Sequence, residues 1–297
     1  DPSCGTGAFL LAMHQAGLKE IHGSELDPRA VAVAEIAVPS AHIAIQDGMR
    51  PGDPVDVVVG NPPYVPPERQ CKQSRDALRA RFSWLGRRFD LAVPFAAAAT
   101  ERVRRHGGMG LLLPSSLLVE RYATPLRRAW LTQHRLTWIS DFQGFPEVSI
   151  RVVGVVLQVQ GKPQPLPING VHPDEILNLD QSPLSLYMQP GDTALVERIR
   201  SRSVELGSIC EVDTGVVSHG PKGGKARLLS DEPGEGRLPY VDAKDMHHSR
   251  IRWLRYEPET MHRPKRLGLF SEPKLLIQRL RGNGPVHAWL DTQGLVA

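Results

Sequence analysis

The sequence predicts an α/β fold, in which one open sheet with its helices is followed by a smaller β-rich region. Short apolar runs alternate with helical patterns over residues 1–160, which is typical of an α/β domain. Acidic, glycine or asparagine residues stand where four successive strands should end. Short alternating strands with interleaved arginine and aromatic residues dominate residues 194–297 and predict the β-rich region.

Size and composition suit two domains or one large one, because the chain has 297 residues and 41% of them are hydrophobic. No run approaches the ~18 apolar residues of a membrane span and no signal peptide is visible, so we expect a soluble cytoplasmic protein. The three cysteines lie far apart, without the spacing of metal ligands or of a disulfide framework. The chain begins at Asp1 without a preceding strand, so we expect a fragment of a longer protein.

The first seven residues, Asp1 to Gly7, are called the glycine turn below, and they lead into a helical pattern over residues 8–16. Gly5 and Gly7 permit positive φ angles and let a ligand approach the backbone closely. The start of the helix adds free N–H groups. Plain strand-to-helix turns have the same pattern, so the turn alone leaves both interpretations open.

Acidic residues follow at the ends of the next two strands. The strand predicted over residues 21–25 ends in Glu25, before a helix that Asp27 caps. An acid about 20 residues past a glycine turn accepts ribose hydroxyls in dinucleotide-binding folds, and we favour this role over a surface charge. Asp47 follows the strand 41–45, where its carboxylate could accept the exocyclic amine of an adenine.

A fourth strand, residues 55–60, runs into Asn-Pro-Pro-Tyr, residues 61–64, called the Asn61 loop below. The two prolines fix φ, remove two N–H donors and push Asn61 into an extended conformation. The carbonyls of Asn61 and Pro62 could accept two N–H groups of a planar amine, while Tyr64 stacks on its face. An ordinary strand-to-turn junction explains the tetrapeptide equally well. Ligands bind outside the carboxyl ends of strands in open α/β sheets, and four such ends in series favour a site.

Basic residues are concentrated directly after this loop, although the net charge of the chain is only +4 and its pI about 9.1. Over residues 68–88 they are Arg69, Lys72, Arg75, Arg79, Arg81, Arg87 and Arg88. Most charge runs are solvated helix faces. Beside a proposed base-binding loop, contacts to nucleic-acid phosphates become the favoured interpretation.

The α/β alternation continues up to residue 160. We expect two helices and three strands, namely helices 91–105 and 122–134 and strands 109–114, 136–141 and 152–160. The last two strands are expected to form an antiparallel hairpin.

These features, in this order, resemble the S-adenosylmethionine-dependent DNA adenine-N6 methyltransferases, and most closely the gamma class of type II and type IIG restriction–modification enzymes. The motifs that carry the resemblance are the glycine turn, Glu25, Asp47 and the Asn61 loop. Three later segments extend it, namely residues 89–95, 107–114 and 142–159. The resemblance is specific over about residues 1–160 and loose beyond them. It implies a Rossmann-like class I methyltransferase sheet, here with its first strand truncated.

The resemblance further implies methyl transfer from S-adenosylmethionine to a flipped-out adenine in a specific double-stranded DNA sequence, without a metal. The residues implied in cofactor binding are Asp1, Cys4, Gly5 and Gly7 at the methionine portion, Glu25 at the ribose and Asp47 at the adenine. The residues implied in catalysis are Asn61, Pro62, Pro63 and Tyr64. Contacts to the base and the DNA are expected from Tyr64, Phe145, Arg69 and Arg75.

Domain order follows from the same resemblance and from composition. We expect a catalytic domain over residues 1–160, a proline-rich linker over 161–193 and part of a target-recognition domain over 194–297. Two alternatives stay open, namely a methyltransferase that acts on RNA or on a protein glutamine, and a non-catalytic DNA-binding subunit. A nuclease, separate or fused, stays open as a partner.

Overall fold

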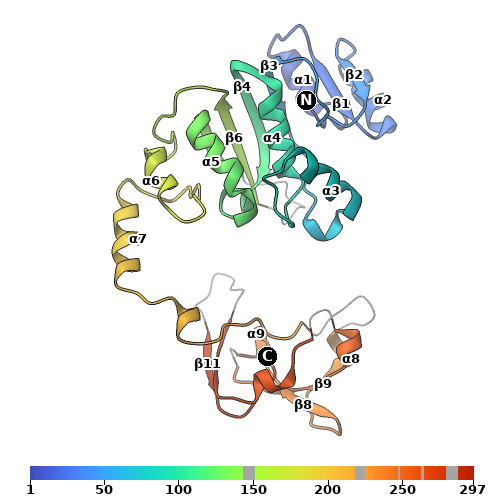
Figure 1. The fold of residues 1–297 in the computed structure, drawn as a ribbon. Helices are drawn as coiled ribbons and strands as arrows, with labels where there is room; N and C mark the ends of the chain where they lie inside the picture. Colours follow the sequence, from blue (N-terminus) through green and yellow to red (C-terminus); the bar gives the residue numbers. More distant parts are fainter. Residues whose placement is uncertain (143–150, 218–224, 247, 262–263, 279–286) are drawn as a thin grey trace. The chain divides into compact units, whose positions relative to one another are not determined.

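The computed structural model describes residues 1–142, 151–217, 225–246, 248–261, 264–278 and 287–297. The chain forms two compact units, residues 1–203 and 204–297, which are described separately here. Helices and strands alternate in the first unit and short strands prevail in the second (Figure 1). The predicted α/β fold class is therefore confirmed.

The N-terminal part of the first unit is a small layer of two parallel strands and two helices. In chain order its elements are α1 (Ala8–Gln15), β1 (His22–Glu25), α2 (Pro28–Ala37) and β2 (His42–Ile45). The strands are short, and the apolar side chains between strands and helices form their own small core, made of Cys4, Leu10, Ile21, Ala34 and Val38. As predicted, Asp27 caps α2 by accepting the N–H of Arg29 at 2.9 Å.

The central sheet has four strands in the order β3-β4-β6-β5. Their bounds are β3 (Val55–Gly60), β4 (Val103–Pro114), β5 (Arg135–Phe142) and β6 (Val152–Gln158). β3 pairs with β4 in parallel, and β6 lies antiparallel between β4 and β5, so the predicted antiparallel hairpin is confirmed. β4 begins directly after α4, because that helix ends at Arg102 rather than at the predicted residue 105.

Two helices, α4 (Ala92–Arg102) and α5 (Thr124–Gln133), lie against this sheet (Figure 1). All residues from Ala92 to Thr100 are buried, as expected of a helix that is apolar on all sides. The remaining elements of this part are η1 (Pro67–Arg69), α3 (Lys72–Arg81), η2 (Ser115–Leu118) and η3 (Arg121–Ala123). In the chain, η1 and α3 directly follow the Asn61 loop.

A groove of about 790 Å³ separates the two sheets of the first unit. It is lined by His22 to Ser24 of β1 and by Val55 to Val58 of β3, and these two strands are not paired with each other. The carboxyl ends of β1 and β3 both reach the glycine turn, as the hydrogen bonds described below establish.

Residues 161–193, predicted to be a linker, instead pack onto the first unit. Their apolar side chains Leu166, Val171, Ile176 and Leu184 are buried in the main core. Short helices α6 (Pro173–Leu177) and α7 (Asp192–Ser201) interrupt the segment. Its prolines and irregular spacing gave no periodic signal, because the segment is held at single buried positions rather than along a helix or strand face.

The fully buried Arg127 of α5 also holds this segment in place. Its guanidinium donates to the carbonyls of Gln181 and Ser182 at 2.7 and 3.0 Å. It also donates to those of Leu117 and Glu120. Burial lowers the pKa of Arg127 to about 10, which leaves it charged at neutral pH. A buried cation with its donors satisfied by backbone carbonyls fixes residues 181–182 against α5.

The second unit is rich in short strands, as predicted. β7 (Leu229–Ser230), β9 (Arg252–Arg255) and β8 (Arg237–Tyr240) form one antiparallel sheet, and β10 (Lys274–Ile277) pairs with β11 (Ala288–Asp291). The helical elements are η4 (Leu206–Ser208), α8 (Lys225–Leu228), α9 (Ala243–Met246), η5 (Pro258–Thr260) and η6 (Leu267–Phe270). Its core includes Val216, Leu228, Tyr240, Leu254 and Phe270.

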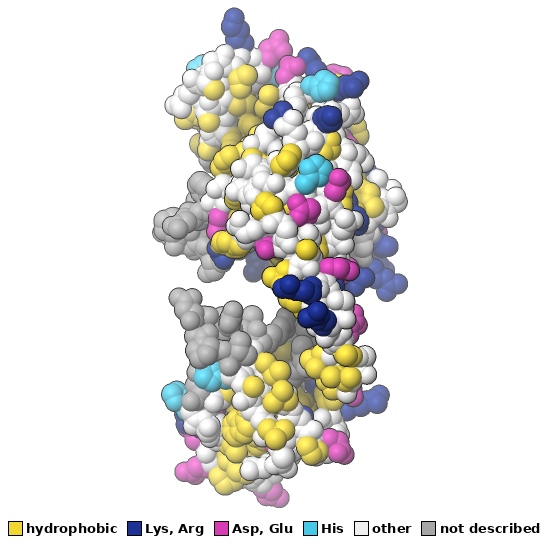
Figure 2. Space-filling view, turned by 90° about the vertical axis from the view of Figure 1, so that its left-hand side faces the viewer, with side chains coloured by type: hydrophobic (Ala, Val, Ile, Leu, Met, Phe, Trp, Pro, Cys, Tyr) yellow, Lys and Arg dark blue, Asp and Glu magenta, His cyan; other side chains and the backbone are white. Residues whose placement is uncertain are grey.

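Hydrophobic side chains also gather on the surface of the second unit (Figure 2). On the paired strands β10 and β11, Leu275, Ile277 and Leu290 are more than half exposed, at 60%, 53% and 67%. Across the described parts of both units, no helix combines the length and apolar character needed to cross a membrane.

Candidate cofactor and catalytic site

The glycine turn lies along β1 through backbone hydrogen bonds. Ser24 donates to the carbonyl of Asp1 at 2.9 Å, and the N–H of Cys4 donates to the carbonyl of Ser24 at 2.9 Å. Gly5 and Gly7 have φ angles of 51° and 92°, the left-handed conformation that favours glycine. The predicted backbone role of these two glycines therefore agrees with their conformations.

Cys4 has its thiol on the inner side of this turn. The side chain is buried in the small N-terminal core, and burial raises the pKa of the thiol. A Cβ on Gly23 would lie 2.9 Å from the Cys4 Sγ, so the turn and the strand pack without room for a side chain there. Any contact of Cys4 with a cofactor would have to come from its backbone.

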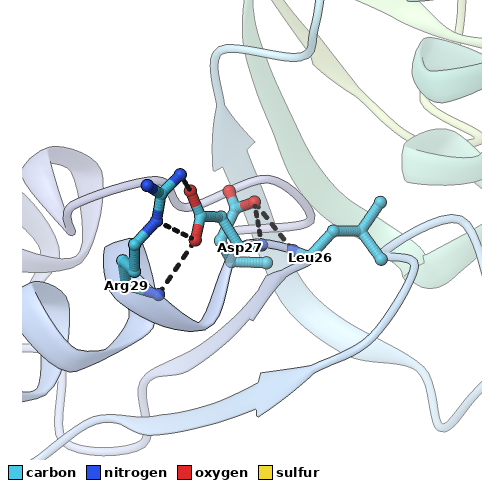
Figure 3. A network of polar contacts seen from close by, with 4 residues as sticks. Leu26, Asp27 and Arg29 are labelled. Atoms are coloured by element: carbon cyan, nitrogen blue, oxygen red, sulfur yellow. Dashed lines mark hydrogen bonds and ion pairs between the residues drawn. The ribbon is translucent and has the colours of Figure 1, made fainter.

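Glu25 binds the glycine turn from the end of β1. Its Oε2 accepts the N–H of Gly5 at 3.0 Å. Its Oε1 accepts the N–H groups of Leu26 and Asp27 at 2.7 and 3.0 Å, and these two bonds are drawn in Figure 3. A carboxylate has about four acceptor positions, so three backbone donors leave capacity for a ligand hydroxyl. The same figure shows Asp27 turned toward Arg29, where it caps α2 rather than facing the turn.

Asp47 and Gly48 bring the end of β2 to the same turn. The Oδ1 of Asp47 accepts the N–H of Met49 at 2.9 Å, which fixes the carboxylate in a tight turn. A Cβ on Gly48 would lie 1.7 Å from the carbonyl oxygen of Pro2, so only glycine allows this approach. The loop after β2 is therefore packed directly against the glycine turn.

The Asn61 loop adjoins the glycine turn from the end of β3. Ser3 Oγ donates to the main-chain carbonyl of Asn61 at 3.2 Å, and a Cβ on Gly60 would lie 2.6 Å from Asp1 Oδ1. The structure thus brings together all four predicted strand-end features. Ser3 escaped the sequence prediction, because nothing in a linear motif indicates a partner 58 residues away.

Two polar atoms of the Asn61 loop are buried without a hydrogen-bond partner among the described residues. They are Asn61 Oδ1 and the Tyr64 hydroxyl. An unsatisfied buried polar atom costs about 1–3 kcal/mol, so such atoms need an explanation. Burial, together with the nearby Asp90 carboxylate, raises the pKa of Tyr64, which keeps its hydroxyl protonated. A ligand that offers donors to Asn61 would satisfy the first of these atoms.

Asp90, just before α4, is a buried carboxylate that sequence reasoning did not assign a role. It accepts the N–H of Ala92 at 2.9 Å, and burial raises its pKa. The backbone N–H of Val65, the residue after Tyr64, lies near this carboxylate and opposes the rise of its pKa. Its position before a helix start was the signal available in the sequence.

The basic run after the loop divides into three groups. Arg75 points inward and donates to the carbonyls of Pro67 and Gln70 at 2.8 and 3.2 Å. Three others form ion pairs, namely Arg79 with Asp76, Arg81 with Glu101 and Arg88 with Glu68. The exposed side chains of Arg69, Lys72 and Arg87 form no ion pair within the described part of the chain. Phe145, the predicted second ring, lies outside the described residues.

A comparison with protein families matches residues 49–147 to the Eco57I restriction-modification methylase family. The matched stretch contains the Asn61 loop, the basic run and three strands of the central sheet, β3, β4 and β5. The name of this family agrees with the resemblance predicted from the motifs.

Curated relatives point to the same group of proteins. The type II methyltransferase M.PaeR7I of Pseudomonas aeruginosa is 24% identical over 67% of this chain and 40% of its own length. The type II methyltransferase M.TthHB8I of Thermus thermophilus is 24% identical over 97% of this chain and 70% of its own length. The resemblance to restriction–modification methyltransferases is confirmed. The chain spans less than half the length of M.PaeR7I.

Solved structures with a similar fold include two that cover about two thirds of the chain. A class I S-adenosylmethionine-dependent methyltransferase from Listeria monocytogenes, itself described as putative, has a TM-score of 0.49 at 17% identity, over 67% of this chain and 62% of that one. A modification subunit of a type I restriction enzyme from Vibrio vulnificus, also described as putative, has a TM-score of 0.44 at 16% identity, over 69% and 48%.

Proposed function

We propose that this protein transfers a methyl group from S-adenosylmethionine to N6 of an adenine that is flipped out of a specific duplex DNA sequence, within a restriction–modification system. The observation that carries the proposal is the buried, unpaired Asn61 Oδ1 in a loop that is hydrogen-bonded to the glycine turn. The matched family and the type II relatives support the reaction class and the biological setting.

The four strand ends offer groups that suit the ribose, adenine and methionine portions of S-adenosylmethionine. Glu25 has acceptor capacity for a ribose hydroxyl, and Asp47 presents a second carboxylate from the neighbouring strand end. A Cβ on Gly5 would have no neighbour within 4 Å, so Gly5 leaves open backbone for the methionine portion, whereas Gly7 packs on Ala34 of α2. When bound, S-adenosylmethionine supplies a methyl group on a positively charged sulfur, and the residues of the chain orient the acceptor toward it.

The Asn61 loop is suited to hold the attacking amine. The lone pair of an adenine amine is delocalised into the ring, so the amine is a poor nucleophile. Acceptance of its two N–H groups by Asn61 Oδ1 and the Pro62 carbonyl favours a tetrahedral nitrogen and stabilises the positive charge that develops there. The rigid backbone at Pro62 and Pro63 keeps the acceptors in place without further reorganisation.

The target base must leave the duplex to reach this loop. Tyr64, half-buried on the main core, would stack on its face, and each aromatic contact replaces about 1–3 kcal/mol of lost stacking. Phe145 stays our candidate for the opposite face. The β-rich residues from 204 onward are proposed to form part of the surface that reads the DNA sequence.

The proposal is tested by methyl transfer from radiolabelled cofactor to DNA, RNA and protein, followed by identification of the methylated product. We expect N6-methyladenine in DNA, and its complete loss in Asn61→Ala with cofactor binding retained. Label in RNA or glutamine would favour the first alternative. DNA binding without transfer would favour a non-catalytic subunit. N4-methylcytosine would keep the reaction class and overturn the adenine assignment.

A further inference from the structure

Gln70 bridges the end of the Asn61 loop and the chain segment just before α4. Its side-chain Nε2 donates to the carbonyl of Val65 at 2.7 Å and to the carbonyl of Phe89 at 2.8 Å. Both partners are acceptors only, so the amide must present its nitrogen to them. The other amide atom, Oε1, is buried without a partner among the described residues. The site therefore uses Gln70 for its donors, at the cost of one unsatisfied acceptor.

Val65 is the residue through which this bridge acts. Its carbonyl accepts Gln70 Nε2 at 2.7 Å and the N–H of Leu91 at 3.0 Å, and its N–H lies near the Asp90 carboxylate and opposes the rise of its pKa. The carbonyl of the residue next to Tyr64 is thus bound both to Gln70 and to Leu91, the N-cap residue of α4. Because Tyr64 precedes Val65 directly, these bonds fix the backbone from which its ring projects.

Gln70 is itself held in position. Arg75 of α3 donates to the main-chain carbonyl of Gln70 at 3.2 Å and to that of Pro67 at 2.8 Å. Cys71, which follows Gln70, caps the same helix by accepting the N–H of Ser74. A series of hydrogen bonds therefore connects α3, a helix of ten residues, through Gln70 to Val65; this series is called the strut below.

We infer that Gln70 is a positioning residue that sets the ring of Tyr64 against the flipped base, and that it acts through Val65 without touching substrate or cofactor. This inference rests on the proposed function. The Gln70 contacts lie on Val65 and Phe89, and the described hydrogen bonds of the cofactor loops involve other residues. Loss of the bridge should therefore change catalysis more than cofactor binding.

The test uses the intact protein and the matched pair Gln70→Met and Gln73→Met. Methionine keeps the length of the side chain and removes both donors, and Gln73 lies exposed on α3. We expect Gln70→Met to lower kcat by about tenfold to a hundredfold, because a small displacement of a positioned group has an effect of that size. The Kd for S-adenosylmethionine should stay within about threefold of wild type, as for an interaction used mainly in the transition state.

A second readout follows the base. With 2-aminopurine at the target position, Gln70→Met should give less fluorescence change or a different final intensity on binding DNA, while Gln73→Met behaves as wild type. Unchanged kcat and fluorescence in Gln70→Met would overturn the inference. Equal losses of kcat and cofactor affinity, or failure of Gln70→Met to fold, would assign Gln70 to the structure instead. Absence of adenine methylation by the wild type would refute the proposed function separately.

Discussion

The hydroxyl of Ser3 donates to the main-chain carbonyl of Asn61 across 3.2 Å, and this bond joins the glycine turn to the Asn61 loop. The N–H of Ser3 also donates to Asp1 Oδ1 at 2.9 Å, so the serine is fixed within its own turn. The distance between a cofactor held by the turn and an amine held by Asn61 therefore depends partly on this side chain. Methyl transfer requires such control, because the reacting atoms must meet in line.

Ser3→Ala removes the hydroxyl and leaves the turn otherwise intact. We expect the variant to lose about 0.5–1.5 kcal/mol of unfolding free energy, the usual net value of one hydrogen bond. The methylation rate should fall, because the Asn61 loop is then less firmly placed. Urea unfolding and single-turnover methylation measure the two effects. Ser83→Ala, in an exposed turn, is the control. Equal rates for both variants would show that the bond is not used in catalysis.

Gly48→Ala tests the packing of the β2 loop on the glycine turn. The new methyl group would meet the Pro2 carbonyl at 1.7 Å, and because this neighbour is backbone the loop must shift. Overpacking of this kind costs about 1–3 kcal/mol, and we expect the affinity for S-adenosylmethionine to fall roughly tenfold or more. Isothermal titration calorimetry measures this affinity. Gly86→Ala is the matched control, since a Cβ there has no neighbour within 4 Å. Wild-type affinity in Gly48→Ala would contradict the described packing.

The folded chain should lose stability in mild acid through His134. This side chain is buried, its Nδ1 accepts the N–H of Gln160 at 3.0 Å, and burial lowers its pKa below the ordinary value of 6.5. Below about pH 6.5 the unfolded chain therefore binds a proton that the folded chain does not, so stability falls as pH falls toward the lowered pKa.

Urea unfolding of wild type and His134→Gln at about pH 7.5 and about pH 5 measures this contribution. We expect a smaller loss of unfolding free energy on acidification in His134→Gln, because glutamine keeps an acceptor and does not titrate. His14→Gln, at an exposed position, should keep the wild-type dependence. Identical pH dependence in all three proteins would refute the role of His134.

The strand-end residues were predictable because each depends on local sequence. Asp27 at a helix start and Glu25 at a strand end are both visible within a few residues of the chain, and the structure places them accordingly. The contacts of Ser3 and Gln70 are different in kind. Both side chains bind main-chain carbonyls, which every residue possesses, so no residue type at the partner position reveals the pair.

The packing of residues 161–193 was hidden for a related reason. The main polar contact of this segment is with Arg127, which in the sequence looks like any other basic residue of an amphipathic helix. In the structure Arg127 is fully buried and bonded to carbonyls 54 and 55 positions later. Prolines and scattered apolar residues in that segment suggested a linker, because its buried side chains follow no period. Tertiary contacts of this kind appear only once the chain is folded.

Arg69 and Arg75 were both expected to contact DNA, and the structure distinguishes them. Arg69 is exposed and forms no ion pair within the described residues, whereas Arg75 is bonded to the carbonyls of Pro67 and Gln70. Removing a phosphate contact lowers the slope of log K against log salt by about 1 and weakens binding to all sequences alike. We expect this behaviour of Arg69→Ala, measured by DNA binding at several salt concentrations.

Arg75→Ala should instead lower the melting temperature and kcat with little change in salt slope, because the contacts of Arg75 hold Gln70 in place. A reduced salt slope in Arg75→Ala with unchanged stability would show that Arg75 leaves the strut to bind phosphate, and would contradict the arrangement described here.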